Sequence, residues 1–164
     1  MSVAFRREGD DEHMEPKFEI PIPAGPNLVT PRGAALIADQ LAQAEAALEG
    51  VEDEAEIKKL RRTLRYWSTR QATADVQPVP DGDAVAFGCT VRLRLNGKER
   101  TVTIVGDDEA DPATGLIAFS APLARTVMGA EAGDFADYGG KADAIEVLNV
   151  RPAQLGADGY YRMD

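Results

Sequence analysis

The chain has 164 residues, which is enough for one hydrophobic core of ordinary size and an appendage. Its 28 acidic and 18 basic residues give a formal net charge of −10, which argues against a general binder of duplex DNA, because phosphate neutralisation requires a dense Lys and Arg surface. A single cysteine and a single histidine exclude a disulfide framework and a structural zinc site. No apolar run approaches the ~20 residues of a membrane span, and the start of the chain lacks the apolar centre of a signal peptide. We therefore expect a soluble, cytoplasmic protein.

Residues 1–28 mix charges with prolines, a composition that buries little apolar surface. They predict a flexible tail. Docking to a partner through Phe18, Ile20 and Ile22 is the alternative interpretation.

A helical hairpin is predicted over residues 29–75. The stretch LVTPRGAALIADQL places Thr30 as an N-cap and Pro31 at the first helical position, where a missing N–H is tolerated. Gly50 is placed to end this helix in a left-handed turn. The apolar stripe of the helix, spaced 4, 3 and 4, consists of Ile37, Leu41, Ala44 and Leu48.

The second helix of the hairpin has positions spaced as in a heptad seam: Ile57, Leu60, Leu64, Trp67, Gln71 and Ala74. Two such stripes joined by a tight turn predict an antiparallel coiled coil. Surface helices of an ordinary bundle would show similar periodicity, so the pattern alone leaves both arrangements open.

The remaining residues predict a small, mostly antiparallel β domain with one short helix, which makes the fold class α+β. Residues 76–83 contain prolines and glycine that cannot continue the helix and form a linker. Residues 84–151 form the domain, and residues 152–164 form a C-terminal tail.

Within the domain, the clearest signal is a β-hairpin. Val91, Leu93 and Leu95 alternate with arginines, and Asn96-Gly97 is the preferred two-residue hairpin turn. Further short strands are expected at 116–119, 134–138 and 144–150, with a helix over 122–128.

Four acids crowd the loop that follows the hairpin: Asp107, Asp108, Glu109 and Asp111. The residues alone favour a solvated connection in a strand hairpin, because exposed charge runs usually have that role. The stretch DDEADPATG does not match a calcium loop, which has glycine at its sixth position and a terminal glutamate.

Several stretches of the second half resemble the C-terminal domain of the GreA/GreB family, the Gre transcript-cleavage factors of bacterial RNA polymerase. They are, in order, FGCTVRL, TVTIVGDDEADPATGLIAFSAPLARTVMG, AGDFADY and AIEVLNV. In the first half, LVTPRGAALIADQL and LRYWSTRQATADV resemble the two ends of the family's hairpin and are nearer to GreB than to GreA. The resemblance spans residues 28–150 and implies a coiled-coil hairpin followed by a domain similar to FK506-binding proteins.

The resemblance also implies a place of action. Gre factors dock their C-terminal domain on the rim of the polymerase secondary channel and insert the hairpin toward the active centre. The family's docking turn falls on Ser120, Ala121 and Pro122, where Ala121 replaces the serine of the pattern. The acids expected to contribute to the same contact, unless they only solvate the loop, are Asp108, Glu109 and Asp111.

At the hairpin tip the sequence departs from the family. The family's "GDlsENaeY" segment is missing, and each arm is about 10 residues shorter, or ~15 Å of reach. Asp53 and Glu56 remain as candidate tip acids that could share a magnesium ion with the polymerase, since the chain has no metal site or cofactor of its own. Alternatively, these acids offset the dipole at the start of the second helix.

Behind the tip lies a basic strip, which could follow nascent RNA or acidic channel walls: Lys58, Lys59, Arg62 and Arg65. Lys58, Arg62 and Arg65 share a helix face. Pairing of the strip with Asp53, Glu54 and Glu56 along the helix is the alternative.

The resemblance predicts a monomeric regulator that binds RNA polymerase and is not itself an enzyme. The short reach favours occlusion of the channel, while stimulation of the polymerase's own RNA cleavage through Asp53 and Glu56 remains the alternative. Two other classes are a peptidyl-prolyl isomerase, which needs an aromatic-lined pocket, and a scaffold that pairs its hairpin with another helix.

Overall fold

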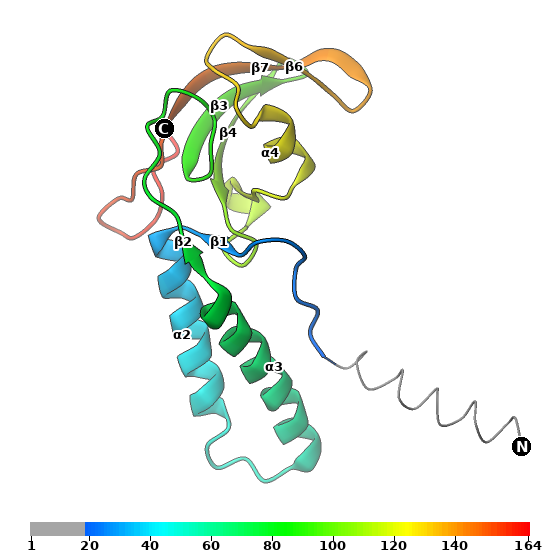
Figure 1. Cartoon of the computed structure of the whole chain (residues 1–164), viewed down its shortest axis with the longest axis vertical. Helices are drawn as coiled ribbons and strands as arrows, with labels where there is room; N and C mark the ends of the chain where they lie inside the picture. The colour runs from blue at the N-terminus through cyan, green and yellow to red at the C-terminus, as the bar shows by residue number, and fades with distance from the viewer. Residues whose placement is uncertain (1–18) are drawn as a thin grey trace, which may run out of the picture. The chain divides into compact units, whose positions relative to one another are not determined.

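The computed structural model describes residues 19–164, drawn in colour in Figure 1. These residues fall into two units. The first contains residues 35–74 and the described residues up to Pro26, and the second contains residues 27–34 and 75–164. No helix of the described residues is long and apolar enough to cross a membrane. Most of the predicted N-terminal tail, including Phe18, lies outside the described residues, whereas Ile20 and Ile22 are exposed.

The first unit is a helical hairpin, apart from the first turn of its first helix, which belongs to the second unit. Helices α2 (Pro31–Ala47) and α3 (Glu54–Thr73) run in opposite directions and are joined by a turn in which Gly50 has φ +74°, as predicted. In α2, Ile37 and Ala44 are buried, in agreement with the predicted stripe.

The heptad prediction for α3 is wrong at its last turn. Ile57, Leu60 and Leu64 are partly buried as expected, but Gln71 is exposed and its neighbour Arg70 is 2% exposed. An α-helix has 3.6 residues per turn, so its inward face drifts away from a strict seven-residue repeat.

The second unit begins with a short parallel pairing that corrects two predicted boundaries. Strand β1 (Leu28–Val29) pairs with β2 (Asp75–Val76), so Leu28 belongs to the folded unit and not to a tail, and Val76 is a strand residue and not linker. Strands of two residues show no detectable periodicity, which is why the sequence did not predict them.

A five-stranded sheet forms the body of this unit, in the order β5-β4-β3-β7-β6. Its strands are β3 (Cys89–Leu95), β4 (Lys98–Val105), β5 (Leu116–Ala118), β6 (Phe135–Tyr138) and β7 (Lys141–Pro152). Asn96 and Gly97 both have positive φ, +52° and +86°, which confirms the tight turn between β3 and β4.

The predicted antiparallel domain is in fact built on a mixed sheet, because β4 and β5 pair in parallel. The acidic loop, residues 106–115, is therefore a crossover and not a hairpin turn; it includes the short 3-10 helix η1 (Pro112–Thr114). Parallel neighbours require such a crossover connection. The sequence placed β5 correctly but contained no signal for its direction.

Helix α4 (Pro122–Val127) packs against the sheet and completes the core. The fully buried core residues of the strands and of α4 include Val91, Leu93, Val102, Ile104, Ile145, Val147, Ala124 and Val127.

The C-terminal segment also packs on the domain, which corrects the prediction of a tail over 152–164. Leu155 and Tyr161 form a β-bridge, and the Thr103 hydroxyl donates to the Met163 sulfur at 3.2 Å. Thr103 also lies 2.8 Å from the buried hydroxyl of Thr90 on β3. These contacts join distant parts of the chain, and a short segment without periodicity does not predict them.

Candidate functional site

The predicted docking turn is a well-defined surface corner between β5 and α4. Ser120 and Pro122 are exposed, and Ala121 is the N-cap residue of α4 with Pro122 in the first turn. The Ser120 hydroxyl does not cap the helix; it donates to Asp107 Oδ1 at 2.6 Å. The turn therefore presents an exposed proline and a serine hydroxyl whose position is set by the crossover loop.

The four acids of the crossover loop have different environments. Asp107 binds Ser120, Asp108 is partly buried, and Asp111 is exposed. Glu109, however, has a side chain that is only 1% exposed. Its assignment to a surface contact is wrong, because its carboxylate is turned into the unit and is fully occupied there.

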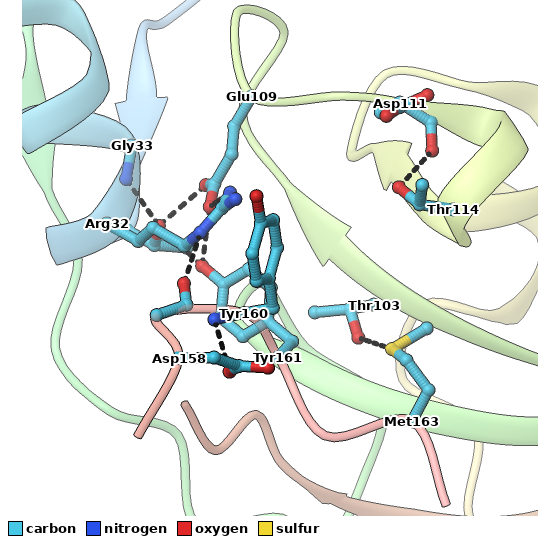
Figure 2. Close-up of polar contacts among 12 residues, drawn as sticks. Arg32, Gly33, Thr103, Glu109, Asp111, Thr114, Asp158, Tyr160, Tyr161 and Met163 are labelled. Carbon is cyan, nitrogen blue, oxygen red and sulfur yellow. Dashed lines mark hydrogen bonds and ion pairs between the residues drawn. The ribbon is translucent and has the colours of Figure 1, made fainter. Parts of the chain in front are cut away.

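Glu109 lies at the centre of a buried polar cluster (Figure 2). Its Oε1 accepts a hydrogen bond from the Thr30 hydroxyl at 2.6 Å, and its Oε2 accepts from the Tyr161 hydroxyl at 2.6 Å and from Arg32 Nη1 at 3.0 Å. A buried carboxylate requires such partners, because an unpaired charge in an apolar interior is strongly unfavourable. All four residues belong to the second unit.

Arg32 is held from several sides. Its guanidinium lies over the rings of Tyr160 and Tyr161, 5.6 and 5.3 Å from their centroids, and its Nε donates to the Gly159 carbonyl at 3.0 Å. Together with the ion pair to Glu109, these contacts fix the first turn of α2 to the crossover loop and the C-terminal segment (Figure 2).

Gly33 makes this close approach possible. A Cβ at this position would lie 2.9 Å from Glu109 Oε1 and 3.4 Å from Thr30 Oγ1. The Gly33 N–H also donates to Thr30 Oγ1 at 2.9 Å, which confirms Thr30 as a helix cap. A glycine inside a helix is unfavourable by about 1 kcal/mol relative to alanine, and this was the signal in the sequence that a close contact lies here.

Burial raises the pKa of the Tyr161 hydroxyl, and the hydrogen bond to the Glu109 carboxylate raises it further. Both effects disfavour the tyrosinate, which would place a second negative charge beside Glu109. The hydroxyl is therefore a hydrogen-bond donor at neutral pH. Burial likewise raises the pKa of the Cys89 thiol, which is a buried core side chain.

At the hairpin tip, Asp53 is the N-cap of α3. Its Oδ2 accepts the backbone N–H of Glu56 at 3.0 Å, and Glu54 and Glu56 occupy the first helical turn. This arrangement gives the N–H of Glu56 an acceptor that the helix itself does not provide, and it places negative charge at the positive end of the helix dipole. Within residues 19–164, no group of three or more His, Cys, Asp or Glu side chains could hold a metal ion.

The basic strip lies along α3. Lys58, Lys59 and Arg65 are exposed and Arg62 is partly buried. Arg65 forms an ion pair with Glu19, with Nη2 2.5 Å from Oε1. The pair joins the strip to the segment that precedes the hairpin, a partner that the helical spacing did not predict.

A mostly apolar cavity of about 230 Å³ lies in the second unit. Phe87 and Tyr161 are the aromatic residues in its lining, which otherwise consists largely of prolines and aliphatic side chains. Small-molecule sites typically have volumes of roughly 300–1,000 Å³. The volume of this cavity lies below that range.

Comparison with known proteins identifies the domain that carries the docking turn. Residues 79–152 match the family model described as "Transcription elongation factor, GreA/GreB, C-term". The GreA of Desulfovibrio desulfuricans is 40% identical over 75 residues, which are 43% of this chain and 46% of the relative. The GreA of Thioalkalivibrio sulfidiphilus is 48% identical over 62 residues, 37% of this chain and 39% of the relative. The chain thus spans about half the length of the curated relatives it matches.

Solved structures with a similar arrangement include GreA/GreB from Nitrosomonas europaea and Gfh1, a GreA factor homologue, from Thermus thermophilus. The first is 18% identical with a TM-score of 0.37 and covers 77% of this chain and 98% of its own. The second is 16% identical with a TM-score of 0.36 and covers 77% and 99%. The ordered motifs, the sequence relatives and the family model together show that residues 79–152 form a domain of the GreA/GreB C-terminal type.

Proposed function

We propose that this chain is a cytoplasmic regulator that binds RNA polymerase through its C-terminal domain and occludes the secondary channel with its short hairpin. The match of residues 79–152 to the GreA/GreB C-terminal domain supports the choice of partner. The exposed corner of Ser120 and Pro122, held by Asp107, supports the docking turn as the contact. The chain acts as a monomer and contributes no catalytic site of its own.

The environment of Asp53 is the observation that favours occlusion of the channel over stimulation of cleavage. One of its carboxylate oxygens caps α3, so the side chain has a structural role that does not require a metal. Activation of a magnesium-bound water requires carboxylates within coordination range, ~2.1 Å. A hairpin that lacks the family's tip segment falls short of that range, and in the cleavage alternative Asp53 and Glu56 would have to share the polymerase's magnesium ion.

Binding is tested with the double variant Ser120→Ala/Pro122→Ala. Its affinity for core RNA polymerase should fall by roughly tenfold, because it loses both the hydroxyl and the fixed turn backbone. Lys98→Ala, a change of an exposed residue in the β3–β4 hairpin, is the control and should bind normally. Equal affinities of the double variant and the wild type would remove the docking assignment.

Occlusion is tested on stalled, backtracked transcription complexes. The wild-type protein should leave intrinsic RNA cleavage unstimulated and should inhibit cleavage by an added Gre factor as its own concentration rises. Asp53→Asn/Glu56→Gln should inhibit equally well. Cleavage that the wild type stimulates and this double variant does not would establish the cleavage alternative in place of occlusion.

A further inference from the structure

The C-terminal segment lies beyond the match to the family, which ends at residue 152, yet it is folded onto the domain. We call residues 153–164 the C-terminal strap. A β-bridge between Leu155 and Tyr161 closes the strap on itself. The side chain of Arg151 donates to two carbonyl oxygens near its end, at 2.7 and 2.9 Å. The strap thus makes defined contacts with the domain, although the family model does not cover it.

The strap contacts the crossover loop, residues 106–115, at two places, and Figure 2 shows the region of the first, around Glu109 and Tyr161. Near the start of the loop, the Tyr161 hydroxyl donates to Glu109 at 2.6 Å. At its end, a Cβ added to Gly115 would lie 2.6 Å from the Met163 methyl carbon, so the strap packs directly on the loop backbone. The strap therefore contacts the crossover at Glu109 and at its last residue, Gly115.

The crossover loop in turn positions the docking turn. Asp107, two residues before Glu109, accepts the hydrogen bond of the Ser120 hydroxyl at 2.6 Å. Close packing of the intervening backbone is also evident at Gly106, where a Cβ would collide with the carbonyl oxygen of Leu28. A loop held at Glu109 and packed at Gly106 leaves Asp107 little freedom to move.

We propose that the C-terminal strap is a positioning element for the docking turn: through Glu109 it fixes the crossover loop, and the loop holds Ser120 in the conformation that RNA polymerase binds. The proposal rests on the proposed function in naming RNA polymerase as the partner. The link from the strap to the docking turn does not depend on that function. Tyr161 is the residue on which the link depends, because its hydroxyl joins the strap to the buried carboxylate.

The test compares Tyr161→Phe with the wild type in the full chain by hydrogen exchange and by affinity for core RNA polymerase. Amides of residues 106–121 should exchange faster by roughly tenfold or more, the effect of one lost hydrogen bond to a charged group. Amides in β3 and β7 should keep their wild-type rates, and the Kd for polymerase should rise by roughly fivefold. Tyr138→Phe, on the opposite edge strand β6, is the control and should change neither readout.

Met163→Ala provides a second break in the same link and should accelerate exchange around Gly115. Unchanged exchange in residues 106–121 of both variants would contradict the proposal that the strap fixes the crossover loop. Faster exchange with an unchanged Kd, or equal acceleration throughout the sheet, would overturn its positioning role. If the wild-type protein does not bind polymerase at all, the proposed function fails, and the exchange measurement still decides whether the strap controls the docking turn.

Discussion

At the residue scale, Glu109 shows how little a charge in the sequence reveals about its environment. It stands among acids in a loop that the sequence predicts to be solvated, but its partners Thr30, Arg32 and Tyr161 lie 79, 77 and 52 residues away in the chain. Asp107 and Glu109 are separated by one residue, yet one binds a surface serine and the other is buried. Only the folded backbone distinguishes their roles.

The first prediction concerns Tyr161 and alkaline pH. Its pKa is raised above the ordinary value of 10.0, so the folded protein keeps a proton that the unfolded chain releases. The stabilisation is present below pH 10 and is lost as pH rises toward the folded-state pKa, with a slope of at most about 1.4 kcal/mol per pH unit for one proton. Chemical denaturation from about pH 9 to 11 should show a steeper loss of stability in the wild type than in Tyr161→Phe.

The groups that face the Tyr161 hydroxyl are Glu109, Thr30 and Arg32, and the first two of these contacts are hydrogen bonds. The matched control is Tyr160→Phe, because Tyr160 is 66% exposed. Its pH profile should follow that of the wild type. Parallel profiles for Tyr161→Phe and the wild type would contradict the raised pKa of the Tyr161 hydroxyl.

At the element scale, helices and hairpins followed from local patterns, whereas pairing partners did not. The cap at Thr30, the left-handed Gly50 and the Asn96-Gly97 turn are local conformations, and each was predicted from one or two residues. The direction of β5 and the pairing of β1 with β2 depend on contacts between distant segments. The acidic loop was predicted as a hairpin turn and is a crossover in the structure, because β5 runs parallel to β4.

The second prediction separates the charge of Asp53 from its capping role. Asp53→Ala should destabilise α3 by about 1 kcal/mol, because the N–H of Glu56 loses its acceptor. Asp53→Asn should retain most of the stability, since an asparagine side chain caps equally well. Circular dichroism during urea denaturation measures both. A loss of stability in Asp53→Asn as large as in Asp53→Ala would show that charge and not capping is the structural contribution.

At the scale of the whole molecule, the excess of acidic over basic residues argues against a general binder of duplex DNA. The formal net charge is −10, and within residues 19–164 the basic strip on α3 is one local concentration of positive charge. The hairpin's large apolar side chains are at least partly covered, and Ile37 and Ala44 are buried.

The third prediction is that the full chain is a monomer. Copies with a net charge of −10 repel each other, and the stripe that would pair with another helix is already partly buried. Sedimentation velocity over a wide concentration range should give one monomeric species. A dimer that disappears in Leu64→Glu would instead support the scaffold alternative.

The sequence by itself determined the helical hairpin, the turn chemistry, the location of most strands and the type of the C-terminal domain, because these depend on local conformational preferences and on ordered motifs. Tertiary structure alone decided that Glu109 is buried, that β5 is parallel to β4 and that residues 153–164 pack on the domain. The physical reason is the same in each case. Burial, strand direction and long-range hydrogen bonds depend on which distant segments meet, and a single chain's local pattern does not encode the partner of a charged or polar side chain.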